Sequence, residues 1–273
     1  MARTIALRQV AEGRFGCVLT VEFAGDSVGP GLAAALAAAE AAGAAGSGGD
    51  LPGPVVTGPD GRHEIWRLDP VTTLELHPGL PGHRALADAC AAEFLRLRPA
   101  DAGPVTVVGY CSAAVFAHHL LHALADAGGP PAHLLLVAAT VPDEETVRRE
   151  YAQLHRKLTG VPAPADPTPL LADPAATVDR LRDELTRLAR AFVTDNGFDA
   201  AEAETAADEI AGRYLAWLWF LLDAARSGPV PVPVPVHEAA DDEEAIDLLR
   251  MRVFDLGIDV GATGAGADNG GTR

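Results

Sequence analysis

The sequence predicts an α/β protein with a mostly parallel, doubly wound sheet. A short run of β-branched residues after Gly103 and Pro104 predicts a buried strand, and residues 134–139 are apolar at every position. Such runs are typical of parallel strands that are covered on both faces. Between them lies a helical pattern that begins at Ala113 and ends at Gly128. Strand, helix and strand in this order form a β-α-β unit, which builds parallel sheets.

The elements before this unit repeat the alternation of strand and helix. Strand composition is found in residues 15–23 and 64–68, and the intervening small-residue loop at 24–31 leads into a helix. Cys17 is expected to be a core residue of its strand. The segment 43–61 is rich in Gly, Ala and Pro and predicts a flexible loop. Helices are expected at 32–42 and 86–97.

A sharp turn joins the strand at 105–109 to the helix that follows it. Gly109, Cys111 and Ala113 form the pattern Gly-x-Cys-x-Ala. In a nucleophile elbow, small residues two positions before and after the central residue let the chain turn and hold the central side chain above the sheet. The N-terminus of the next helix offers N–H groups and a partial positive charge, which stabilise a thiolate and an oxyanion. We therefore predict that Cys111 is a nucleophile.

This elbow resembles that of the α/β-hydrolase thioesterases of polyketide and nonribosomal peptide assembly lines, especially the stand-alone type. The resemblance rests on residues 109–113, on the strand at 133–139 and on a long helical insertion after Pro142, and it covers about residues 15–258. Cysteine replaces the usual serine, and Ala113 replaces the second glycine. The resemblance implies the α/β-hydrolase fold and an oxyanion hole formed by the N–H of Ser112 and that of Ala24 or Gly25.

Residues 142–227 are mostly helical, with expected helices at 144–158, 178–193 and 200–225 and a Pro-rich break at 162–174. At this point of the topology the family carries helices that cover the nucleophile, so the resemblance implies a lid. We expect a core of residues 1–142 and 228–260, a lid of residues 143–227, and a disordered Gly- and Ala-rich tail at 261–273.

Aromatic residues, scarce elsewhere, gather at 214–222. An aromatic run at helical spacing usually belongs to the core, but one face of it is able to line an acyl channel. We expect Trp217 and Phe220 to line the substrate pocket together with Tyr110 at the elbow.

The family also needs an acid after a later strand and a histidine after the last one, because the nucleophile requires a base and the base requires an orienting acid. Asp241 is the first choice for the acid and Asp242 the second, although both equally suit the charged first turn of a helix that ends near Arg250. A final strand is expected at 251–254. No histidine follows His237, so His237 is the best substitute by topology.

The other histidines are weaker candidates for the base. His118, His119 and His122 lie on the helix after the elbow, and His77 and His83 lie in a predicted loop. Each is more typical of a surface or packing histidine. A thiol needs a base less than a hydroxyl does, which fits the pairing of a cysteine with a missing histidine.

Proline alternates with valine from Pro229 to Pro235. Since proline donates no hydrogen bond, a strand here forms a normal ladder on one side only. We expect either an altered sheet edge or a segment of polyproline II.

The formal charge of −17 argues against a nucleic-acid partner, because phosphate binding needs clustered Lys and Arg. Three widely spaced cysteines, Cys17, Cys90 and Cys111, indicate neither a disulfide framework nor a zinc site. No signal-peptide pattern, membrane span, metal motif or nucleotide motif is found. We expect a soluble cytoplasmic protein without a cofactor; its oligomeric state stays open.

Two functions remain open on these grounds. The first is an enzyme in which Cys111 attacks an acyl thioester on a carrier protein or on coenzyme A, followed by hydrolysis, acyl transfer or cyclisation in natural-product biosynthesis. The only modest basic patch for an acidic carrier is at Arg148, Arg149, Arg156 and Lys157. The second is a binding or scaffold protein in which a hydrolase fold has lost its chemistry. The missing histidine favours the second, and the retained cysteine favours the first.

Overall fold

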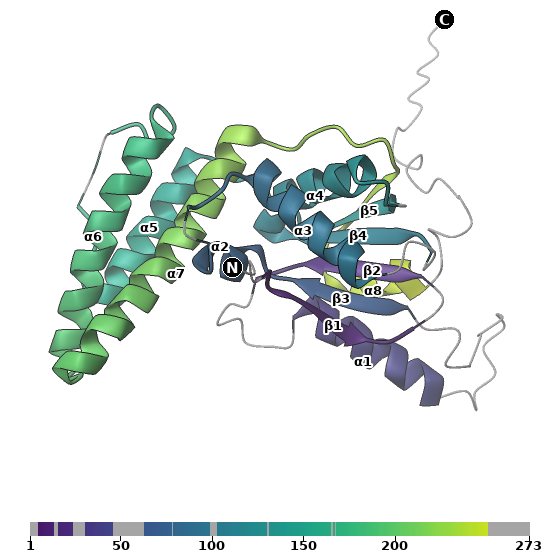
Figure 1. Cartoon of the computed structure of the whole chain (residues 1–273), viewed down its shortest axis with the longest axis horizontal. Coiled ribbons are helices and arrows are strands. Elements are labelled where there is room, and N and C mark those ends of the chain that lie inside the picture. Colours follow the sequence, from purple (N-terminus) through teal and green to yellow (C-terminus); the bar gives the residue numbers. More distant parts are fainter. Residues whose placement is uncertain are drawn as a thin grey trace, which may run out of the picture.

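The computed structural model describes residues 5–13, 16–23, 31–45, 63–77, 79–98, 103–129, 131–164, 166 and 168–250. Within these ranges the chain forms a six-stranded sheet with helices on its two faces and three further helices beside it (Figure 1). Along the chain, the first elements are β1 (Leu7–Ala11), β2 (Cys17–Val21), α1 (Leu32–Ala45), β3 (Glu64–Leu68), α2 (Pro70–Glu75) and α3 (His83–Leu97). They continue with β4 (Val105–Tyr110), the 3₁₀ turn η2 (Cys111–Ala113), α4 (Ala114–Asp126), β5 (Pro131–Val137), α5 (Glu144–Thr159), α6 (Pro174–Asp195), α7 (Ala200–Ser227), β6 (Val236–Ala239) and α8 (Asp242–Arg250).

The strands lie in the order β1-β3-β2-β4-β5-β6. Strand β1 pairs with β3 in the antiparallel direction, and the other four pairings are parallel. The predicted mostly parallel sheet is therefore confirmed. Because parallel strands end at one edge of the sheet, the register brings Val21, Tyr110, Val137 and Ala239 to the same edge.

Alternate residues of the strands feed two cores on opposite faces of the sheet. Leu19 and Val107 pack with the buried residues of α3 and α4. Val18, Val108 and Leu135 pack with α1 and α8. A β-strand directs successive side chains to opposite faces, so apolar residues at every position require helices on both sides. This is the doubly wound arrangement that the sequence predicts.

Helices α5, α6 and α7 form a continuous insertion between β5 and β6, called here the three-helix insertion. Figure 1 shows α6 outermost and α7 running back toward the sheet. The side chains of Asp143 and Asp173 accept hydrogen bonds at the first turns of α5 and α6, and Gly160 ends α5 with a φ of 75°. These are ordinary start and stop signals of helices. No helix in the described part of the chain is long and apolar enough to cross a membrane.

Two elements escape the sequence prediction. Strand β1 is a short edge strand with exposed Arg8 and Gln9, so it lacks the apolar run of the central strands. Helix α2 has only six residues, too few to show a helical period, and begins where Asp69 accepts a hydrogen bond from the backbone N–H of Thr72 at 3.0 Å.

The proline-rich segment forms no strand of its own. Strand β6 begins only at Val236, and the preceding residues 228–235 run as an irregular connector. Its carbonyl groups are used nonetheless: Val230 accepts from His118 Nδ1 at 2.9 Å, Pro231 accepts from His122 Nε2, and Pro235 accepts from the N–H of Leu134 at 3.0 Å. The strand predicted at 251–254 and the tail at 261–273 lie outside the described residues.

Candidate active site around Cys111

Cys111 stands at the turn between β4 and α4 with a backbone φ of 51°. A positive φ is uncommon outside glycine and marks a strained turn. The turn is possible because helix and strand approach closely at Gly109: a Cβ there would lie 2.7 Å from Ala117 Cβ and 3.0 Å from Ala114 Cα. Ala113, the substitute for the second glycine, is fully buried. The local geometry is that of a nucleophile elbow.

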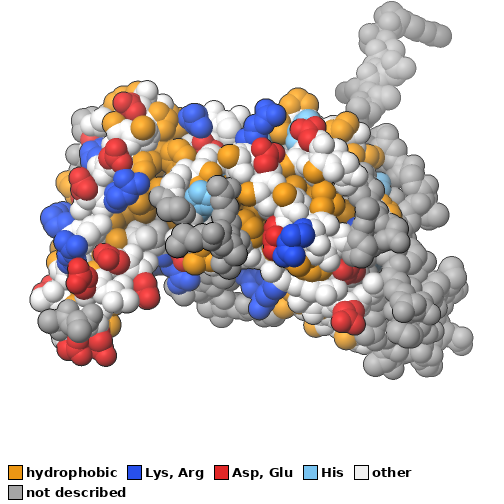
Figure 2. Space-filling view, viewed as in Figure 1, with side chains coloured by type: hydrophobic (Ala, Val, Ile, Leu, Met, Phe, Trp, Pro, Cys, Tyr) orange, Lys and Arg blue, Asp and Glu red, His pale blue; other side chains and the backbone are white. Residues whose placement is uncertain are grey.

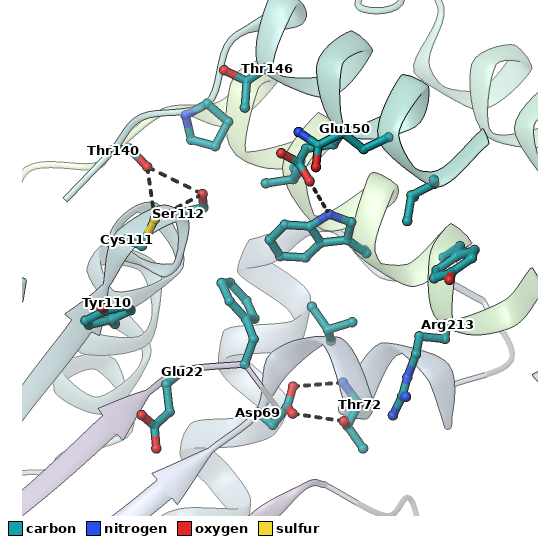
Figure 3. A pocket seen from close by; sticks show the side chains of 18 of the residues that line it. Glu22, Asp69, Thr72, Tyr110, Cys111, Ser112, Thr140, Thr146, Glu150 and Arg213 are labelled. Carbon is teal, nitrogen blue, oxygen red and sulfur yellow. Dashed lines mark hydrogen bonds between the residues drawn. The ribbon is translucent and has the colours of Figure 1, made fainter. Parts of the chain in front are cut away.

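Two hydroxyl groups are close to the thiol. Cys111 Sγ lies 3.7 Å from Thr140 Oγ1 and 3.9 Å from Ser112 Oγ, and the two hydroxyl oxygens are 3.4 Å apart. The backbone N–H of Thr140 also donates to the carbonyl of Cys111 at 3.3 Å. Figure 3 shows this triangle at one side of the pocket. Thr140 comes from the loop after β5, so the loop after the neighbouring strand holds the elbow in place.

The thiol borders a cavity of about 760 Å³ between the edge of the sheet and the three-helix insertion. Its apolar wall combines Phe23 and Val71 from the core with Leu154, Trp217 and Leu221 from the insertion. Such a volume with a mainly apolar wall is typical of pockets for small organic ligands. Trp217 and Tyr110, which the sequence analysis expects in a substrate pocket, are among the residues that line this cavity.

Phe220, which was also expected in the substrate pocket, does not line the cavity. It is fully buried and packs against Phe23, Phe116 and His83 in the main core. Phe220 is one helical turn from Trp217 and the two rings stack 6.4 Å apart, so Phe220 packs against Trp217 without itself lining the cavity. The loop residues Ala24 and Gly25, expected at the oxyanion hole, lie outside the described residues, whereas Ser112 lines the cavity directly after Cys111.

The two candidate acids have different surroundings. Asp241 Oδ1 accepts the N–H of Glu244 at 3.0 Å and so caps α8. Asp242 lines the cavity and accepts a hydrogen bond from the hydroxyl of Tyr110. Burial, together with the neighbouring charge of Asp242, raises the pKa of Tyr110. The second choice of the sequence analysis is thus the carboxylate that faces the pocket.

Glu22, directly after β2, is a further carboxylate at this edge that sequence reasoning missed. It is only 4% exposed, lies 3.0 Å from Arg67 Nε and accepts the N–H of Ala33 at the start of α1. Burial raises the pKa of Glu22, and Arg67 opposes this effect. Thr140 was missed as well. A polar residue within three positions of the end of a buried strand is the sequence signal that both share.

All nine histidines lie in the described ranges, and none of them lines the cavity. His237 sits on β6 with its ring 5.5 Å from that of His133, at the other end of β5 from Thr140. His118 and His122 bind the connector through its carbonyls, and His119 lies against the carbonyl of Gly228. The structure therefore does not bring His237 or the histidines of α4 to Cys111.

His83 was expected in a loop, but it is the first residue of α3 and is 1% exposed. Its N–H donates to Asp223 Oδ2 at 2.5 Å, while its ring packs against Phe116 and Phe220. Burial lowers the pKa of His83 to about 4. His77, by contrast, accepts the N–H of Gly79 at Nδ1, 3.3 Å away, in the loop before α3. Neither reaches the thiol.

Charged groups line the part of the cavity away from Cys111. Glu75 pairs with Arg213 at 3.0 Å, and Glu150 accepts from Trp217 Nε1 at 3.3 Å. Within the described residues no group of three His, Cys, Asp or Glu side chains could hold a metal ion. The reactive groups that line the pocket beside Cys111 are the hydroxyls of Ser112 and Thr140 and the carboxylates of Glu22 and Asp242.

No family model matches this chain, and no curated protein matches it. Several solved structures match this chain. A Vlm2 thioesterase domain bound with a dodecadepsipeptide matches with 15% identity and a TM-score of 0.40 over 85% of this chain and 76% of that chain. A four-domain nonribosomal peptide synthetase bound to AMP and glycine matches with 13% identity and a TM-score of 0.46 over 94% of this chain and 20% of its own. An epoxide hydrolase of the α/β-hydrolase superfamily matches with 14% identity and a TM-score of 0.35 over 93% and 100% of the two chains.

Proposed function

We propose that the protein is a thioesterase-like enzyme in which Cys111 takes the acyl group from a thioester of a carrier protein or of coenzyme A. The observation that carries the proposal is the position of Cys111, at a strained elbow with a φ of 51° and on the wall of the 760 Å³ cavity. A strained nucleophile at the end of a strand, open to a largely apolar pocket, is the arrangement that acyl transfer requires.

In the first step the thiolate of Cys111 attacks the carbonyl carbon of the donor thioester. The carbon–sulfur bond of the donor breaks, its sulfur leaves as a thiolate that takes a proton from the solvent, and an acyl thioester on Cys111 remains. The backbone N–H of Ser112 is the described candidate for an oxyanion donor, because it follows the nucleophile at the start of the helical turn.

The second step passes the acyl group from Cys111 to water, to an amine or to a hydroxyl. With no histidine in the cavity, no imidazole is available there to deprotonate water. A thioester keeps a good leaving group, so an amine of the substrate or a second substrate is able to attack it without that base. We therefore propose acyl transfer or cyclisation alongside hydrolysis. Asp242, through Tyr110, is the proposed acid of the site.

The alternative is a binding protein with a degenerate hydrolase fold, and the absence of histidine from the cavity favours it. The test is intact-mass spectrometry after incubation with a panel of acyl-pantetheine thioesters, on the native chain and on Cys111→Ala. If the protein is an enzyme, the native chain should form an acyl adduct, and Cys111→Ala should form it at least about a thousandfold more slowly.

Peptide mapping supplies the internal control. Cys17 and Cys90 are buried, and burial raises the pKa of each to about 12, so neither should carry the acyl group. An adduct on Cys111 alone supports the enzyme. No adduct and no turnover with any acyl group, together with slow alkylation of Cys111 by iodoacetamide, would establish the binding protein.

A further inference from the structure

One face of α5 lines the cavity along its whole length. The residues on this face are Thr146, Arg149, Glu150, Gln153, Leu154 and Lys157. They recur at intervals of three and four, which is the spacing of a single helical face. Figure 3 shows Thr146 nearer to Thr140, which adjoins the thiol, than to Arg213 at the far side of the pocket. The helix then leads away from Cys111 toward Lys157.

The acidic groups of the cavity already have partners. Glu22 pairs with Arg67, Glu75 with Arg213, and Glu150 with the indole of Trp217. Asp69 caps α2, and Asp242 binds Tyr110. In the described part of the chain, none of these contacts joins an acid of the lining to Arg149 or Lys157.

Two cations of the lining differ in this respect. Arg149 and Lys157 make no hydrogen bond or ion pair with the described part of the chain. Their neighbour Arg148, in contrast, points away from the cavity and is held by Glu144, at 2.5 Å, and by the carbonyls of Asp166 and Thr168. Neither cation thus forms an ion pair with a carboxylate of the lining; outside the lining, Arg149 is near enough to Asp143 to help lower the pKa of that carboxyl.

The residue type of Lys157 further supports a specific role for these two cations. Lys157 is the only lysine among the 21 Lys and Arg residues of the chain. Figure 2 shows the basic side chains of the visible face scattered among acidic ones, so a positive field is not general in this protein of formal charge −17. Two unpaired cations on the wall of one cavity therefore form a local site for an anion.

We propose that Arg149 and Lys157 bind an anionic group of the acyl-thioester substrate, either a carboxylate on the acyl chain or the phosphate of the pantetheine arm. The eleven helical steps from Thr146 to Lys157 correspond to about 16 Å along the helix, at about 1.5 Å per residue. An extended peptidyl chain of about five residues covers that length. The inference rests on the proposed function, because it assigns a substrate class to the same cavity.

The test measures binding to Cys111→Ala, so that no turnover intervenes. Four ligands are compared by calorimetry: an acyl-pantetheine with a neutral chain end, the same chain ending in a carboxylate, and the phosphopantetheine form of each. The double variant Arg149→Gln, Lys157→Gln in the same background should weaken anionic ligands at least about tenfold and change the neutral one by less than about twofold.

The matched control is Arg156→Gln. Arg156 is next to Lys157 in the sequence but does not line the cavity. Removing its positive charge should change the affinity for every ligand by less than about twofold. If the double variant loses affinity only for the ligands whose acyl chain ends in a carboxylate, the site binds the acyl chain. If it loses affinity only for the phosphopantetheine ligands, the site binds the pantetheine arm. Equal affinity of all four ligands for the parent protein, or equal losses in the control and the double variant, would overturn the proposal.

A second readout uses the single lysine. Acetylation of Lys157 by an amine-reactive ester, followed by peptide mapping, should slow several-fold when an anionic ligand saturates the cavity and stay unchanged with the neutral one. Anion-selective binding without an acyl adduct on the native chain would leave this site standing and remove the proposed function. An adduct without any preference for charge would do the reverse.

Discussion

Gly109→Ala tests whether the elbow depends on the close approach of β4 and α4. The added methyl carbon would lie 2.7 Å from Ala117 Cβ and 3.0 Å from Ala114 Cα, whereas ordinary contacts begin near 3.4 Å. The shortfall at Ala117 is therefore 0.7 Å, and one of the close atoms is backbone, so rotation of a side chain cannot relieve both contacts. Helix α4 must move away from the sheet.

Forcing one methyl group into a packed site costs about 1–3 kcal/mol. The gain from a stiffer unfolded chain, about 0.4–1 kcal/mol, is smaller than most of this range. For a chain of this size each kcal/mol shifts the melting temperature by roughly 2–4 °C. We therefore expect Gly109→Ala to lower Tm by several degrees in thermal unfolding followed by circular dichroism.

Gly212→Ala is the matched control, because it makes the same chemical change inside α7. A Cβ at Gly212 meets nothing within 4 Å. Alanine is favoured over glycine in a helix by about 1 kcal/mol, so this variant should gain stability and melt a few degrees higher. The reasoning is refuted if Gly109→Ala melts at or above the native temperature, or if the two variants shift Tm in the same direction.

Three further predictions concern charge. Burial lowers the pKa of His83 to about 4 from 6.5; between these values the unfolded chain binds a proton that the folded chain does not, so stability falls as pH drops from 6.5 to 4, by about 3 kcal/mol in all. Urea unfolding over this range should show a flatter profile for His83→Leu, and an unchanged slope would contradict the assignment. Arg98→Met breaks an ion pair in which the Arg98 side chain is 2% exposed and should cost about 3–5 kcal/mol, whereas Arg96→Ala, at an exposed pair, should cost less than about 1 kcal/mol in the same assay. Asp241→Ala should remove a helix cap at about 1 kcal/mol without slowing acyl-adduct formation, and Asp242→Asn should slow it about tenfold or more at unchanged stability; the opposite pattern would make the capping residue the functional acid.

The elements around the elbow could be predicted because local signals decide them. The strands β4 and β5 are apolar on both faces, and such a pattern has only one stable setting, between two layers of helices. The turn at Cys111 is set by small residues at Gly109 and Ala113, which are visible in the sequence. Strand β1 carried no such signal, because it lies at the sheet edge and two of its five residues are polar.

The site was harder to predict because it depends on which of two neighbours faces inward. Asp241 and Asp242 are adjacent and chemically equal, and only the start of α8 decides that the first caps the helix and the second faces the cavity. The same holds for Trp217 and Phe220 on α7, where the packing of the insertion selects the face. His237 lies on the expected strand, but its position along β6 keeps it from the edge where Cys111 stands.

The connector of residues 228–235 has a mechanical consequence. Four prolines fix their φ angles, and two histidines of α4 hold its carbonyl groups. It therefore acts as a stiff tether that ties the end of α7 to the body of the protein. The opposite junction, from Ala138 to Pro142, contains the exposed Val141 and a residue with a φ of 46°. Because α7 also packs into the main core through Phe220, the connector and this packing together keep the wall of the cavity fixed relative to the edge of the sheet that carries Cys111.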